Sequence, residues 1–120
     1  MTRAELWKNF IALLSQYAAV LREPDINSFV SGMLPTPAGQ ETRDPSFSRT
    51  YHRLFPSENV DDDSPAVYRK LAQFIDEELV GWWVIPAAKR IADDLRLASV
   101  DPNAAPEPLH TWTQALNRSR

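Results

Sequence analysis

The side chains best suited to chemistry in this sequence are basic ones, grouped within and just before residues 45–55. Arg49 and Arg53 are four positions apart, so they lie on the same side if this stretch is helical. Arg43 and His52 are close to them in sequence. Like charges one helical turn apart repel each other unless an anion lies between them, and a nucleic-acid phosphate is such an anion. The spacing therefore favours contact with a nucleic-acid backbone.

Two further basic pairs follow along the chain, Arg69 with Lys70 and Lys89 with Arg90. They could extend the first group into a longer basic track. The alternative is that these side chains are the solvated face of helices, which is the commoner role of charged stretches. Aromatic residues do not alternate with the arginines, so stacking on bases is not indicated. The predicted nucleic-acid-binding set comprises Arg43, Arg49, His52, Arg53, Arg69, Lys70, Lys89 and Arg90.

The residues that hydrolytic or transfer catalysis requires are scarce in this chain. Its only histidines, His52 and His110, are far apart and are not set at ligand spacing with carboxylates. The 3 glycines are too widely separated to build a glycine-rich phosphate loop. We therefore expect a protein that is not an enzyme, with no catalytic residue, no cofactor and no small-molecule ligand.

The acidic run at 61–63 is the stretch that could suggest a divalent metal. A calcium loop opening at Asp61 needs an oxygen ligand, a glycine and a glutamate at positions that hold Pro65, Ala66 and Ala72. Acidic residues are favoured at the start of a helix by the helix dipole, which explains the run without a metal. The sequence predicts no metal site.

Composition places the chain among ordinary globular proteins. Its 120 residues are 43% apolar and 24% charged, enough to bury a core in one domain. With 13 basic and 16 acidic side chains the net charge is -3, so any contact with nucleic acid must be local. Because the sequence shows no cysteine, signal peptide or membrane-length apolar run, we expect a cytoplasmic protein that does not bind membranes.

The element around which we expect the rest to pack is a long helix over about 65–98. Ser64 is its predicted cap, and Pro65 suits its first turn. Pro86 must kink this helix or break it, and a kink is favoured because two basic residues would lie near the positive end of a new helix. The predicted buried stripe is Tyr68, Leu71, Ala72, Ile75, Leu79 and Trp82, continued by Ala88, Ile91, Leu95 and Ala98.

Shorter helices are predicted on both sides of the long one. Thr2 and Glu5 form a possible capping box for the first of them. Asp25 is the predicted cap of the second, and Asp44 followed by Pro45 starts the third. These helices and a last one in the tail cover about 4–21, 26–34, 45–55 and 109–117, with a loop at 35–44.

Two parts of the chain could contact a partner. The first helix is apolar almost all round, so we expect its own domain or a neighbour to contact it on more than one side. In the tail, Trp112 either folds back onto the domain, which is the favoured alternative, or anchors another chain. The predicted partner-binding residues are Trp7, Trp112 and Leu116.

The predicted fold is all-α, a compact bundle of about four to six helices around the long helix. Residues 1–100 are expected to form a helical domain. A proline- and alanine-rich arm at 101–108 then leads to the short helix at 109–117, which docks on the domain or on a partner.

In size, helical make-up and lack of active-site residues, the chain resembles the small subunits of CRISPR effector complexes. The resemblance covers the whole chain and is one of class, so it assigns no role to any single residue. It implies a non-catalytic subunit of a multi-protein nucleoprotein assembly. Such a subunit contacts other subunits, including copies of itself, through apolar helix faces and holds the backbone of RNA or single-stranded DNA.

The alternative function is that of an acidic protein-binding regulator, such as an inhibitor, immunity or adaptor protein, without nucleic-acid contact. The acidic clusters at 61–63 and 76–78 would then face a basic partner. Retention of nucleic acid that is lost at high salt separates the two functions.

Overall fold

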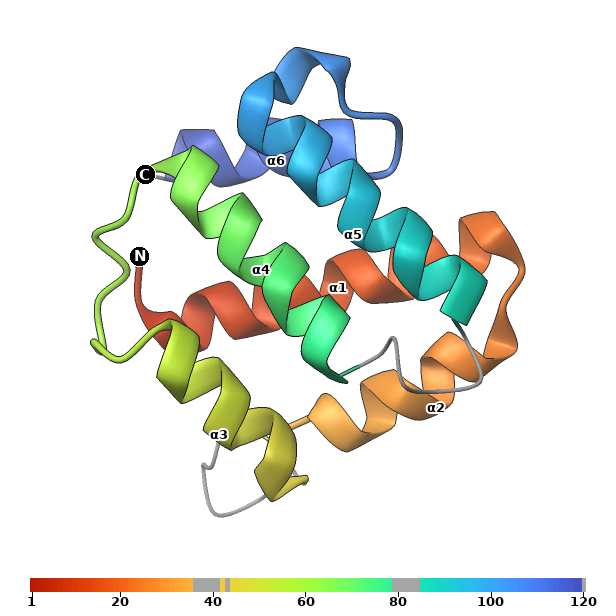
Figure 1. Ribbon diagram of the computed structural model, residues 1–120, viewed down its shortest axis with the longest axis horizontal. Coiled ribbons are helices and arrows are strands. Elements are labelled where there is room, and N and C mark those ends of the chain that lie inside the picture. The colour runs from red at the N-terminus through yellow and green to blue at the C-terminus, as the bar shows by residue number, and fades with distance from the viewer. Residues whose placement is uncertain (36–41, 43, 79–84, 120) are drawn as a thin grey trace. The chain divides into compact units, whose positions relative to one another are not determined.

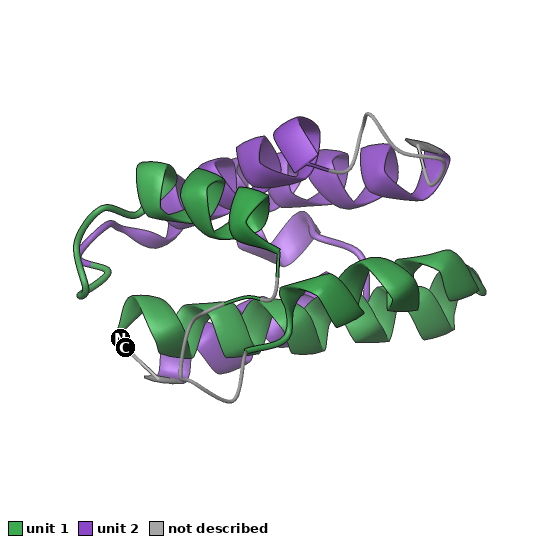
Figure 2. Cartoon of the chain, turned by 90° about the horizontal axis from the view of Figure 1, so that it is seen from below, with its two compact units in different colours: residues 1–60 green, residues 61–120 purple. Residues whose placement is uncertain are grey.

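The computed structural model describes residues 1–35, 42, 44–78 and 85–119 (Figure 1). Its contacts divide the chain into two compact units, Met1–Val60 and Asp61–Arg120, which Figure 2 shows in green and purple. The sequence predicted a helical domain over residues 1–100, followed by an arm and a short last helix. The division at residue 60 assigns the three N-terminal helices to one unit and the predicted long-helix region to the other.

The described residues form six α-helices and one short 3-10 helix. The first unit contains α1 (Arg3–Leu21), α2 (Pro24–Met33) and α3 (Pro45–Leu54), and the second contains α4 (Ser64–Glu78), α5 (Ile85–Val100), the 3-10 helix η1 (Pro102–Ala104) and α6 (Leu109–Ser119). Within the described residues, β pairing is limited to an isolated bridge between Thr2 and Asn59. The all-α prediction is confirmed.

Two of the predicted helix starts are confirmed in the first unit. The hydroxyl of Thr2 accepts a hydrogen bond from the amide of Glu5 at 3.1 Å, which satisfies one of the free donors of the first turn. The Asp44 carboxylate accepts from the amide of Ser46 at 2.9 Å, and Pro45 occupies the first position of α3. These local signals set where α1 and α3 begin.

The caps predicted for the second helix and for the long helix are wrong. α2 begins two residues earlier than expected, with Pro24 at its first turn, so Glu23 occupies the cap position and Asp25 lies inside the helix. At the start of α4, the Asp63 carboxylate accepts from the amide of Ala66 at 2.8 Å. Ser64, the predicted cap, instead forms a hydrogen bond between its hydroxyl and the side-chain oxygen of Asn117 at 2.9 Å.

Aromatic side chains make the core of the first unit. Trp7 and Tyr51 meet edge to face with ring centroids 4.4 Å apart, and Phe29 lies 4.7 Å from Phe47. The Trp7 indole donates to the carbonyl of Met33 at 2.7 Å. These contacts connect all three helices, because Trp7 belongs to α1, Phe29 to α2, and Phe47 and Tyr51 to α3.

Gly32 allows α2 to approach α3 closely. A methyl group added to Gly32 would lie 3.0 Å from the ring edge of Phe47, which is closer than ordinary van der Waals contact. The carbonyl of Gly32 also accepts a hydrogen bond from the hydroxyl of Thr42 at 2.6 Å and one from the amide of Asp44 at 3.1 Å. This glycine therefore holds the chain just before α3 against α2.

We expect the substitution Gly32→Ala to destabilise the protein by about 1–2 kcal/mol. Alanine gains about 1 kcal/mol of helix propensity, but Phe47 is 2% exposed and packed on Phe29, so displacing it costs more than that gain. Urea denaturation followed by circular dichroism measures the difference. Ser31→Ala, one position earlier on the exposed side of α2, is the matched control. A stabilised Gly32→Ala protein would show that the Phe47 ring moves aside freely.

The long helix predicted over 65–98 is broken rather than kinked. α4 ends at Glu78 and α5 begins at Ile85, and the two helices lie side by side and run in opposite directions (Figure 1). Asp76 of α4 forms an ion pair with Arg96 of α5. Residues 20 positions apart in one continuous helix would be separated by about 30 Å, so this pair exists only because the chain folds back.

Pro86 lies at the second position of α5. A proline there removes no helical hydrogen bond, because the first amides of a helix have no partner within it. The helix-start role of this proline outweighs the small unfavourable effect of Lys89 and Arg90 in the first turns of α5. Leu79 and Trp82, which were expected on the buried stripe, lie outside the described residues.

The rest of the predicted stripe is buried in the second unit. Alanines make up half of its α5 portion, and small side chains let packed helices approach closely. α6 contacts α5 and η1, so the C-terminal helix packs within its own unit. The fully or nearly fully buried stripe residues are Tyr68, Leu71, Ala72, Ile75, Ala88, Ile91, Leu95 and Ala98.

The first turn of α6 is capped by a carboxylate on the arm that precedes it. The side chain of Glu107 accepts from the amide of Thr111 at 2.8 Å and from the Thr111 hydroxyl. The hydrogen bond from the hydroxyl lowers the pKa of Glu107 below its ordinary value, and nearby His110 lowers it by a smaller amount. Both interactions favour the charged form of the carboxylate. The arm therefore takes part in setting where α6 begins.

Candidate nucleic-acid interface

The exposed face of α3 carries the basic residues that the sequence singled out first. Arg49, His52 and Arg53 are exposed, and Arg49 and Arg53 are separated by one helical turn as predicted. The opposite face of α3 holds the buried Phe47 and Tyr51. Burial of one face of this short helix thus directs the guanidinium groups to the other.

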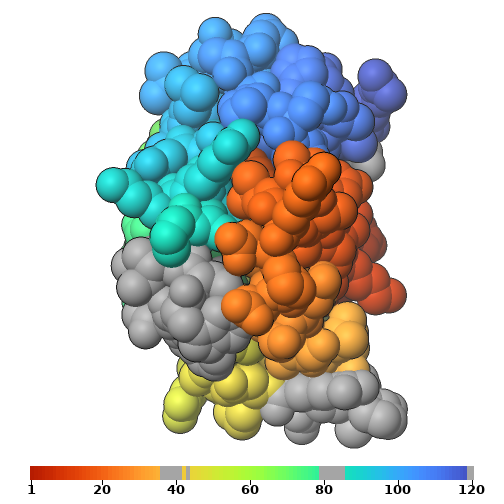
Figure 3. All heavy atoms as spheres, turned by 90° about the vertical axis from the view of Figure 1, so that its right-hand side faces the viewer, coloured from red at the N-terminus to blue at the C-terminus, as the bar shows by residue number. Residues whose placement is uncertain are grey.

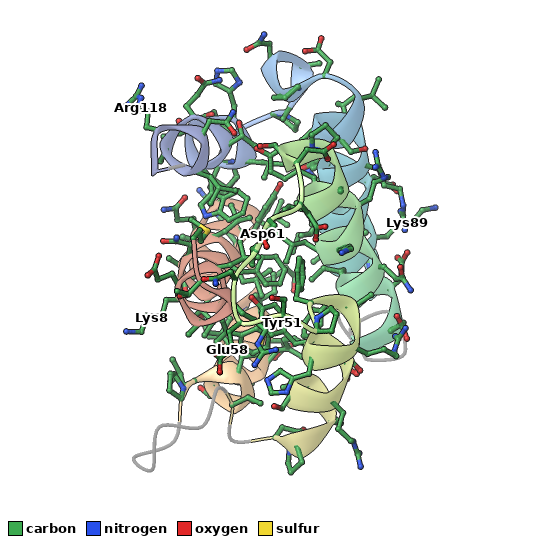
Figure 4. All side chains as sticks on the ribbon, turned by 90° about the vertical axis from the view of Figure 1, so that its left-hand side faces the viewer. Lys8, Tyr51, Glu58, Asp61, Lys89 and Arg118 are labelled. Carbon is green, nitrogen blue, oxygen red and sulfur yellow. The ribbon has the colours of Figure 1, made fainter. Side chains whose placement is uncertain are left out.

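Contacts within the first unit fix the orientation of α3. The Tyr51 hydroxyl donates to the carbonyl of Arg3 at 2.7 Å, and Figure 4 shows Tyr51 pointing into the interior. In return, the Arg3 guanidinium donates to the carbonyl of Phe55 at 3.0 Å and to that of Pro56 at 3.2 Å. These hydrogen bonds join the start of α1 to the last turn of α3 and to the residues just after it. They hold α3 against α1 with its basic face outward.

The charged side chains within this helix are all positive. α3 contains Arg49 and Arg53 but no aspartate or glutamate, and the adjacent Asp44 is engaged as its cap. Arg53 and His52 also lie in the last turn, where positive charge interacts favourably with the carbonyl end of the helix. That interaction is a structural role for these two residues. Arg49, one turn earlier, gains little from it, because the effect decays within the last turn.

The remaining predicted cations fall outside this face. Arg43 lies outside the described residues. Arg69, Lys70, Lys89 and Arg90 belong to the second unit. Figure 3 shows the first turns of α5, in cyan, at the molecular surface, and Figure 4 shows Lys89 extending outward from α5. The chain therefore carries two separate groups of cations, one in each unit.

Two of the cations in the second unit are engaged by carboxylates of the same chain. The Lys70 ammonium lies 2.6 Å from a carboxylate oxygen of Asp62, and the Arg90 guanidinium lies 3.8 Å from Asp94. The side chain of Asp94 is only 12% exposed. Such intramolecular pairs compete with a phosphate, so Lys70 and Arg90 are weaker candidates than Arg49 of α3.

The three predicted partner-binding side chains are all buried. Trp7 is 1% exposed, Trp112 is 8% exposed and Leu116 is 3% exposed. Trp112 lies near Tyr68 of α4, with ring centroids 6.3 Å apart, so it packs on its own unit. Each of the three side chains is therefore packed within the chain that carries it.

Arg96 is a charged residue whose contacts the sequence analysis missed. Its guanidinium bridges Asp76 on α4 and Asp93 on α5, the latter at 3.2 Å. The pair with Asp93 follows from their three-residue spacing and could have been predicted. The pair with Asp76 follows only from the packing of α4 on α5, for which the sequence contains no local signal.

No described helix is long and apolar enough to cross a membrane. Among the described residues, no three metal-ligating side chains come together. Comparison with protein-family models, with curated proteins and with solved structures found no match to this chain.

Proposed function

We propose that this protein is a non-catalytic helical subunit of a nucleoprotein assembly and that α3 binds nucleic-acid backbone. One observation carries the proposal: Arg49 and Arg53 lie one turn apart on an exposed, carboxylate-free helix face. Guanidinium groups bind phosphate oxygens through two parallel hydrogen bonds, and two of them at this spacing reach neighbouring phosphates along a strand. His52 adds a polar contact on the same face.

The alternative of an acidic protein-binding regulator has less support. Its acidic surface would use the aspartates at 61–63 and the acids at 76–78. Asp62 pairs with Lys70, Asp63 caps α4 and Asp76 pairs with Arg96. Carboxylates engaged in these ways are less available to a basic partner. Arg49, by contrast, is exposed and lies on a helix that contains no carboxylate.

The proposal predicts that the substitutions Arg49→Ala and Arg53→Ala together weaken binding to single-stranded nucleic acid by about tenfold, or about 1.4 kcal/mol. Fluorescence anisotropy with labelled single-stranded RNA and DNA measures the affinity over a series of salt concentrations. Loss of two phosphate contacts makes the negative slope of log K against log salt shallower by about 1.4. Because both side chains are exposed, the variant is expected to keep its fold.

The matched control removes the same charge from other exposed positions, Lys8 on α1 and Arg118 on α6, which both point outward in Figure 4. The double variant Lys8→Ala and Arg118→Ala is expected to bind within about twofold of the unsubstituted protein, because only the general charge has changed. Equal weakening in the two double variants would assign the binding to net charge and not to α3. Absence of salt-sensitive binding would remove the nucleic-acid function.

A further inference from the structure

We draw no further inference here: the strongest candidate, the groove between α4 and α5 that is lined by Arg69, Gln73, Asp76, Arg96, Ser99 and Val100, carries nothing because nothing in the part of the chain that the structure describes shows what covers it.

Discussion

Replacing Trp7 by alanine is expected to lower the free energy of unfolding by about 3–5 kcal/mol, a large share of the stability of a small protein. Trp7 is 1% exposed, and its ring meets Tyr51 edge to face with centroids 4.4 Å apart. The substitution also leaves the buried carbonyl of Met33 without the indole donor, which lies 2.7 Å away. A cavity and an unsatisfied acceptor thus arise together.

The measurement for Trp7 is urea denaturation followed by far-ultraviolet circular dichroism, which does not depend on tryptophan fluorescence. Trp7→Phe retains most of the apolar volume and loses the donor, so it is expected to fall between the unsubstituted protein and Trp7→Ala. Lys8→Ala, at the next position and exposed, is the control and is expected to change stability by less than about 0.5 kcal/mol. A Trp7→Ala protein as stable as this control would mean that the aromatic core of the first unit is not packed as described.

Replacing Trp112 by alanine is expected to cost about 3–5 kcal/mol as well, through the second unit. The sequence left two roles open for this residue, packing on its own chain or anchoring another one. Trp112 is 8% exposed and lies near Tyr68, and its helix neighbours Leu109 and Leu116 are 0% and 3% exposed. A residue in such a position contributes to the stability of the isolated chain, whereas a partner anchor does not.

Thermal and urea unfolding of the purified chain measure the effect at Trp112. Arg118→Ala, on the same helix and exposed, is expected to leave the unfolding midpoint nearly unchanged. Trp112→Phe separates loss of volume from loss of aromatic contact, because it keeps a ring beside Tyr68. If Trp112→Ala unfolds at the same urea concentration as the unsubstituted protein, the tryptophan does not pack on its own unit and a role in binding another chain becomes the better explanation.

The proposed nucleic-acid contact depends on a local arrangement of charge. The arginines of α3 present positive charge without a carboxylate on the same helix, which suits a phosphate backbone. A net charge of -3 is compatible with this contact, since the contact depends on a local arrangement and not on the overall field.

The amino-acid sequence by itself determined the fold class and the faces of the helices. Period-three and period-four spacing predicted which side of each helix is buried, as with Phe47 and Tyr51 on α3, because a helical backbone imposes that period on its side chains. The exposed pair of Arg49 and Arg53 follows from the same rule. Cap and proline signals located the starts of α1 and α3 for an equally local reason.

Where several local signals competed, the sequence did not decide between them. Asp61, Asp62, Asp63 and Ser64 are all suitable caps, and the backbone before α4 gives the role to Asp63. Ser64 is then available to Asn117 of α6, a contact between residues 53 positions apart. In the same way, α2 begins two residues before the expected position, because Pro24 fits the first turn of a helix as well as it ends the preceding one.

Only the tertiary structure decided that α4 and α5 are two helices packed side by side. The apolar stripe continues through both, and a continuous rod and a folded pair bury the same residues, so periodicity does not distinguish them. The distinction lies in contacts between distant residues, such as Asp76 with Arg96, and these depend on the path of the chain and not on local propensity. The groove beside that ion pair, between α4 and α5, exists for the same reason.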